Sequence, residues 1–98
     1  MIRNTIIQAI HNRQVIEFTY KGFTRIVEPF LLGTTTTGKV ALRGYQIGGG
    51  SSSGRIVNWH LFTLANMENL RITDSTFSGS RPGYNPADSA MVAIYARI

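Results

Sequence analysis

The sequence contains no cysteine, which excludes a disulfide framework, a thiolate nucleophile and a zinc site built on thiolates. Its two histidines, His11 and His60, are far apart in the chain, so no single element carries a pair of metal ligands. No apolar run approaches the roughly 18 residues of a membrane-spanning helix, and the first residues lack the apolar core of a signal peptide. We therefore expect a soluble, cytoplasmic protein that uses no metal, no cofactor and no membrane.

Acidic side chains are also scarce: five Asp and Glu stand against ten Lys and Arg, which gives a net charge of +5. None of the five carboxylates forms a close pair with a histidine of the kind that acid–base catalysis uses. The serines between Gly48 and Gly54 lack the Gly-x-Ser-x-Gly context of a nucleophile. We therefore expect no enzymatic activity and no catalytic residue. The positive surplus favours an anionic partner, commonly nucleic acid, although small domains also carry such charge for solubility alone.

A hairpin between Gln14 and Pro29 is the expected centre of the fold. The chain has 98 residues, of which 43% are hydrophobic, so it is long enough for one core and too short for two. Apolar and polar residues alternate from Gln14 to Tyr20, as in a half-buried strand, and Gly22 can supply the positive φ of a tight turn. A second run from Phe23 to Val27 returns antiparallel. Pro29 then predicts a sheet edge or a strand end.

The rest of the chain predicts short elements packed onto this hairpin. Apolar residues at helical spacing predict a helix from Asn4 to Asn12, and period-two alternation predicts three more strands. These strands are Lys39–Ile47, Arg55–Leu64 and Asn69–Thr73. A linker begins at Ser78, and residues 87–98 fit either an amphipathic helix, which we prefer, or a strand. The prediction is a mainly β domain with five strands and flanking helices.

Several segments occur in an order that resembles the WYL domain family. The matching segments are Ala9-Ile10, Ile16–Tyr20, Arg25-Ile26-Val27-Glu28-Pro29 for the family's Arg-x-Val-Glu-Pro, Val40-Ala41-Leu42-Arg43-Gly44-Tyr45 for its Trp-Tyr-Leu followed by Gly-Tyr, Trp59-His60-Leu61-Phe62-Thr63-Leu64, Thr73-Asp74 and Phe77. The likeness covers about residues 5 to 77. The family's Trp and Tyr are replaced by Val40 and Ala41, and its Asp-Arg by Phe62-Thr63. Part of the set that lines the family's ligand pocket is therefore missing.

This resemblance implies a fold and a class of function. The fold would be a small Sm-like or SH3-like five-stranded barrel over residues 1–77, followed by a linker and a C-terminal helix over residues 78–98. The function would be that of a regulatory sensor that binds nucleic acid or a nucleotide-type effector. WYL proteins usually carry an added DNA-binding helix-turn-helix, which this sequence lacks, so it resembles a divergent, free-standing member.

The first candidate binding site is a shared strand face. Arg43 and Tyr45 lie two positions apart on one face of their predicted strand, and the small Ala41 leaves room beside them. Binding of single-stranded nucleic acid combines cations that contact phosphate with aromatic rings that stack on bases. The expected phosphate contacts are Arg25, Arg43 and Arg55. We predict that these cations and the aromatic ring meet in one hollow that solvent reaches.

Two residues of the following strand extend this site. Trp59 is either a core residue or a stacking platform at the mouth of a groove, and His60 is either exposed on the surface or a hydrogen-bonding group in the pocket. The expected function is a non-enzymatic regulatory module that binds an anionic ligand such as single-stranded nucleic acid or a nucleotide. The alternative is a protein-interaction or oligomerisation module, in which the barrel forms a homo-oligomer or the C-terminal helix docks on a partner protein.

Overall fold

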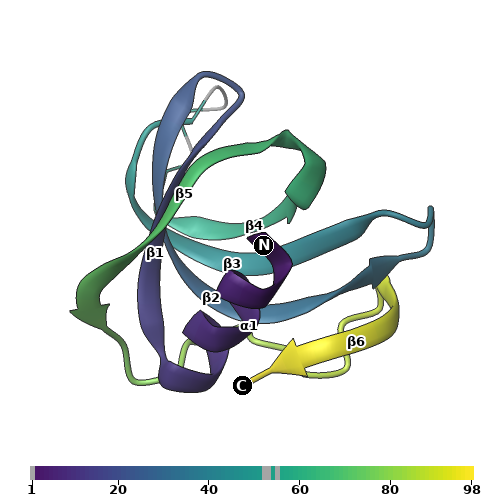
Figure 1. Ribbon diagram of the computed structural model, residues 1–98. Coiled ribbons are helices and arrows are strands. Elements are labelled where there is room, and N and C mark those ends of the chain that lie inside the picture. Colours follow the sequence, from purple (N-terminus) through teal and green to yellow (C-terminus); the bar gives the residue numbers. More distant parts are fainter. Residues whose placement is uncertain (1, 52–53, 55) are drawn as a thin grey trace.

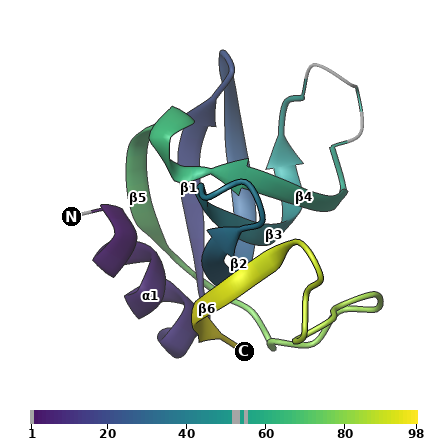
Figure 2. The same cartoon turned by 90° about the vertical axis from the view of Figure 1, so that its right-hand side faces the viewer.

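The computed structural model of the protein describes residues 2–51, 54 and 56–98, which form a mainly β structure with one α-helix at the N-terminus (Figures 1 and 2). The elements in chain order are α1 (Ile2–Asn12), β1 (Gln14–Tyr20), β2 (Phe23–Thr35), β3 (Val40–Gly49), β4 (Asn58–Thr63), the 3-10 turn η1 (Leu64–Asn66), β5 (Met67–Thr76) and β6 (Met91–Arg97). Every strand pairing in this described part of the chain is antiparallel.

The predicted hairpin is confirmed as β1 and β2. Tyr20 pairs directly with Phe23, so the connection consists of Lys21 and Gly22 alone. Both of these residues have positive φ, at 52° and 82°. Positive φ at both central residues is typical of the type I′ turn, whose twist matches the twist of the two antiparallel strands. Figure 1 shows this hairpin projecting at the end of the sheet opposite α1.

The sequence suggested a sheet edge or a strand end at Pro29, but strand β2 continues through Pro29 to Thr35. The register with β3 shifts between Pro29 and Leu31, which places one extra residue in β2. Pro29 also lies where the neighbour along the other edge of β2 changes from β1 to β6, so its missing N–H costs no ladder hydrogen bond. Phe30, at the shift, is fully buried together with Leu31 and Leu32.

The sheet has the strand order β4–β3–β2–β1–β5, and β6 pairs with the second half of β2. Figure 1 shows the sheet curling, and η1 connects β4 directly to β5, which are the two ends of this path. No ladder joins β4 to β5 within the described residues, so the sheet is not closed. The expectation of a small β-rich domain is confirmed, but the sheet has six strands where five were predicted.

The predicted C-terminal helix is wrong, because Met91–Arg97 form strand β6. The apolar residues here fit a helical stripe, but they also include the β-branched and aromatic types that favour strands. The deciding contribution is not local: the backbone of Leu31–Thr35 extends beyond β1 and would present an unpaired edge without β6. Gly33 permits the close approach, since a Cβ there would clash with the carbonyl oxygen of Ala93.

The core lies between the curled sheet and α1. The helix contributes Ile6, Ala9 and Ile10, which lie on one face at helical spacing and are buried. From the sheet, Phe18 and Phe62 pack edge to face with ring centroids 5.0 Å apart, a favoured aromatic geometry. In the part of the chain that the structure describes, no helix is long and apolar enough to cross a membrane.

Candidate functional site

Strands β3 and β4 form a ribbon whose two faces carry different predicted residues. Tyr45 pairs with Trp59 across the ribbon, and Gly44 pairs with His60. Successive residues of a strand point to opposite faces, so Trp59 and His60 project to opposite sides. Each side has a hollow of its own.

We name the two hollows after the segments that border them. The linker hollow, of about 230 Å³, lies between the ribbon and the linker (residues 77–90) and is lined by Arg43, Trp59, Gly83, Tyr84, Asn85 and Asp88. The hairpin hollow, of about 190 Å³, lies at the β1–β2 turn. Its polar lining residues are Lys21, Arg25, Ser51 and His60, and its apolar and aromatic lining residues are Tyr20, Leu61 and Phe62.

The structure therefore divides the six predicted binding residues. On the linker side lie Arg43, Tyr45 and Trp59. On the hairpin side lie Arg25 and His60. Arg55 lies outside the described residues. The expectation that the cations and rings meet in one hollow is wrong for the described five, because Arg25 and Arg43 line different hollows on opposite faces. Their roles in ligand binding stay predictions.

In the linker hollow, Arg43 is neutralised by Asp88. The Arg43 Nε donates to Asp88 Oδ2 at 2.7 Å, and Nη2 donates to Oδ1 at 3.3 Å, which makes a two-point ion pair. The hydrogen bond from Arg43 lowers the pKa of the Asp88 carboxyl below its ordinary value, against the opposing effect of burial. The Asp88 carboxylate also accepts from the Ala90 N–H. This pair fixes the linker to the outer face of β3.

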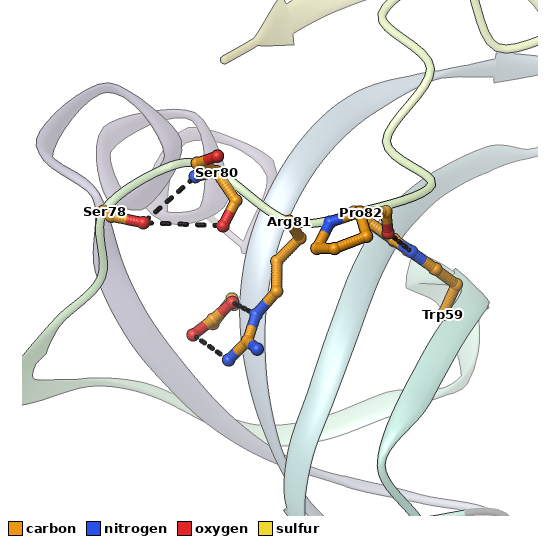
Figure 3. A network of polar contacts seen from close by, with 6 residues as sticks. Trp59, Ser78, Ser80, Arg81 and Pro82 are labelled. Carbon is orange, nitrogen blue, oxygen red and sulfur yellow. Dashed lines mark hydrogen bonds and ion pairs between the residues drawn. The ribbon is translucent and has the colours of Figure 1, made fainter.

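A second ion pair of the same kind joins the linker to β2. The Arg81 Nε donates to Glu28 Oε1 at 2.8 Å and its Nη2 donates to Oε2 at 3.1 Å, while the guanidinium lies 4.4 Å from the centre of the Tyr45 ring. Figure 3 shows the Arg81 side chain extending away from the linker backbone, beside Pro82. Glu28 is buried, so this pair satisfies a carboxylate that water barely reaches.

Aromatic contacts complete the linker side. The Trp59 ring packs against Phe30, Tyr45 and Tyr84, with ring centroids 4.9, 5.3 and 6.0 Å away, and its Nε1–H donates to the carbonyl oxygen of Pro82 (Figure 3). Trp59 is therefore a half-buried residue that packs the linker against the sheet. On this side of the molecule the Trp59 ring packs against other aromatic rings, and Arg43 and Arg81 each have a carboxylate partner.

The hairpin hollow contains a buried arginine, Arg25, that has no carboxylate partner among the described residues. Arg25 is only 4% exposed; its Nη1 donates to Gln46 Oε1 at 3.3 Å and its Nη2 to the Tyr20 carbonyl oxygen at 3.1 Å. Its Nε–H is buried and has no acceptor within the described residues. Both acceptors are neutral, so the positive charge of Arg25 is not compensated there. Burial lowers the pKa of the Arg25 guanidinium, with Tyr20 acting in the opposite direction.

The position of Arg25 is fixed by its surroundings. Gln46 is fully buried, and its Nε2 donates to the carbonyl oxygens of Gly48 and Gly50 at 2.9 and 3.0 Å, which turns its Oε1 towards Arg25. The guanidinium carbon lies 5.5 Å from the centre of the Tyr20 ring and 5.8 Å from that of Phe62, distances at which a cation is attracted to a ring face. The guanidinium is therefore held in one place before any ligand arrives.

The charge and the size of the hairpin hollow favour a small anion. Its lining combines the cations Lys21 and Arg25 with His60, and no carboxylate is among the described residues that line it. Its volume of about 190 Å³ is below the roughly 300–1,000 Å³ of pockets that enclose a whole ligand. It has room for one anionic group, with the remainder of the ligand outside.

Some residues of these sites gave no usable signal in the sequence. Glu28 and Asp88 pair with arginines that lie far away in the chain, and no local pattern predicts such pairs. Nothing in the sequence distinguishes Gln46 from any other polar strand residue. Lys21 could have been predicted as a binding residue, because it is a cation in the predicted turn next to Tyr20. Among residues 2–51, 54 and 56–98, no group of three or more His, Asp or Glu side chains is arranged to hold a metal ion.

Comparison of the chain with protein-family models, with curated proteins and with solved structures finds no match. In the linker hollow Arg43 is paired with Asp88, whereas in the hairpin hollow Arg25 has no carboxylate partner among the described residues.

Proposed function

We propose that this protein is a non-enzymatic regulatory module of WYL type that binds an anionic ligand, such as single-stranded nucleic acid or a nucleotide, in the hairpin hollow. The observation on which the proposal rests is the uncompensated charge of Arg25, which is 4% exposed and donates only to neutral acceptors among the described residues. The Sm-like or SH3-like barrel type is part of the same proposal. It is supported by the curled sheet and by the short η1 connection between its two end strands.

A buried cation without a counter-charge destabilises the fold that contains it. Removing a charge from water costs several kcal/mol in proteins, and a nearby opposite charge is what usually offsets that cost. Within the part of the chain that the structure describes, Arg25 donates through two of the five N–H groups of its guanidinium. An anion in the hollow supplies the missing charge, and Lys21 at the rim adds a second attraction.

The residues assigned to binding therefore change from those that the sequence favoured. Arg25 and His60 remain, and Lys21 joins them. Arg43 and Trp59 hold the linker in place, and a ligand that hydrogen-bonds to Arg43 Nε or Trp59 Nε1 would have to displace Asp88 or Pro82.

Fluorescence anisotropy with labelled single-stranded oligonucleotides at low salt, and competition by nucleotides, tests this proposal. We expect binding that weakens as salt rises, since phosphate contacts release counterions. Arg25→Met, which keeps an unbranched side chain and removes the charged guanidinium, is expected to weaken binding at least tenfold, whereas Arg71→Met, at an exposed arginine of β5, leaves it unchanged. Binding that is absent, or that Arg25→Met does not alter, contradicts the proposal.

One observation favours an oligomerisation module as a second function. Strand β6 pairs only with β2 in the described part of the chain, and its side chains Val92, Ile94 and Tyr95 are 68%, 37% and 40% exposed. An exposed edge strand with apolar side chains is suited to pairing with a second copy of the chain. Light scattering of the wild type and of Val92→Lys tests this: a dimer that the substitution dissociates supports it, and a wild-type monomer rejects it.

A further inference from the structure

The hairpin hollow has one exposed end and one buried end. Lys21 lies at the exposed turn and marks the open end. Arg25 is 4% exposed and is packed against the aromatic rings of Tyr20 and Phe62. A group that contacts the guanidinium must therefore enter through the exposed end and cannot pass beyond the aromatic rings at the buried end.

This shape separates two kinds of phosphate. An internal phosphodiester continues into the chain on both sides, so both arms would have to enter and leave through the same opening. A terminal phosphate is joined to the rest of its molecule through one oxygen, so it can enter first while the rest stays outside. The hollow, at about 190 Å³, has room for the phosphate and not for two flanking nucleosides.

Charge also distinguishes a terminal phosphate from an internal phosphodiester. A phosphomonoester carries about −1.5 to −2 charges at pH 7, whereas each internal phosphate of a nucleic acid carries one. The cations that line the hollow are Lys21 and Arg25, with His60 beside them and no carboxylate among the described lining residues. Two positive charges match a dianion better than a monoanion.

Building on the proposed function, we infer that the hairpin hollow recognises a terminal phosphomonoester and discriminates against internal phosphodiesters. Arg25 contacts the phosphate at the buried end and Lys21 contacts it from the rim, while the sugar or base stays outside. The phosphomonoester belongs either to the end of a nucleic-acid strand or to a free mononucleotide, and the same group is recognised in both.

The test uses the full chain and three single-stranded oligonucleotides of one sequence, labelled at an internal base. They carry a 5′-phosphate, a 3′-phosphate or no terminal phosphate, and inorganic phosphate and a nucleoside 5′-monophosphate serve as unlabelled competitors. We expect at least one phosphorylated strand to bind about tenfold or more tightly than the unphosphorylated strand. Displacement by the mononucleotide is also expected, and failure of the mononucleotide to displace a phosphorylated strand would overturn the inference.

Variants distinguish failure of this inference from failure of the proposed function. Equal binding of all three strands, lost in Arg25→Met, overturns terminal-phosphate recognition and leaves anion binding at the hollow intact. No binding of any strand or competitor overturns both. Lys21→Gln is expected to reduce the preference for the phosphorylated strand, while Lys39→Gln, the same change at another exposed lysine next to a turn, leaves that preference unchanged. An equal effect of the two lysine variants would also overturn the inference.

Discussion

Arg43 and Arg25 lie on opposite faces of one sheet, and they differ in whether a carboxylate compensates their charge. Arg43 forms a two-point ion pair with Asp88, as Arg81 does with Glu28, so the charges of these two arginines are compensated. Arg25 is more deeply buried than Arg43 and donates only to neutral oxygens within the described residues. An internally paired arginine stabilises the fold, whereas an unpaired buried arginine lowers stability and is retained, on our account, for a ligand.

The largest stability effect is expected on the linker side. Glu28→Gln removes the carboxylate that Arg81 contacts twice, and we expect a loss of about 2 kcal/mol in the free energy of unfolding, between the values for exposed and buried pairs. Urea unfolding measures this loss. Glu68→Gln, the same change at an exposed acid, is the control and is expected to have little effect. If Glu28→Gln also abolished ligand binding, the two sides would not be independent.

A backbone substitution sharpens the same contrast. Gly83 has a φ of 86°, and an added Cβ would lie 3.1 Å from Trp59 Nε1, so we expect Gly83→Ala to cost about 1–2 kcal/mol. Gly38→Ala is the matched control, because Gly38 has a φ of 83° with no atom within 4 Å of the added Cβ. The difference between the two variants in thermal unfolding isolates packing of the linker on Trp59. Equal losses would show that this packing contributes nothing.

The acid dependence of stability is expected to come partly from the linker side. The pKa of Asp88 is lowered in the folded state, mainly by the hydrogen bond from Arg43. The stabilisation is therefore fully present above the ordinary carboxyl pKa of about 3.9 and is lost as the pH falls through the lower folded value. Urea midpoints measured between pH 5 and pH 2 should fall less steeply in Asp88→Asn than in the wild type. Identical slopes would contradict the assignment.

The smallest expected effect is at the rim of the hairpin hollow. Lys21 is exposed, so its attraction to a bound anion is screened, and we expect Lys21→Gln to weaken ligand binding about threefold, or about 0.6 kcal/mol. Anisotropy titrations at two salt concentrations measure this effect, which should shrink as salt rises. A loss as large as that of Arg25→Met would move the centre of the site to the turn.

The sequence predicted those parts of the fold that depend on neighbouring residues. Alternation and the Lys21-Gly22 pair predicted the β1–β2 hairpin, and apolar spacing predicted α1. For residues 87–98 the sequence left helix and strand open and we preferred the helix, because the strand's pairing partner is the distant second half of β2. Tertiary pairing decided between the two.

The candidate site was predicted in part for a similar reason. Alternation correctly placed Arg43 and Tyr45 on one face of β3. Which face Arg25 occupies depends on the register between β2 and β3, which shifts twice, and each shift by one residue exchanges the faces. No sequence pattern predicts those shifts, and none predicts that Asp88 returns to neutralise Arg43.

On our account, the charge of Arg25 serves to bind an anion and does not stabilise the fold. Urea unfolding of the wild type and of Arg25→Met, each with and without a nucleoside monophosphate, tests it most directly. Without ligand we predict a change within about 1 kcal/mol, because relief of the buried charge offsets the loss of two hydrogen bonds. Ligand at about 100 times the wild-type Kd should stabilise the wild type by about 2.7 kcal/mol and the variant, with binding at least tenfold weaker, by at most about 1.4 kcal/mol. A variant destabilised by several kcal/mol, in a protein whose stability the ligand does not alter, would contradict the claim.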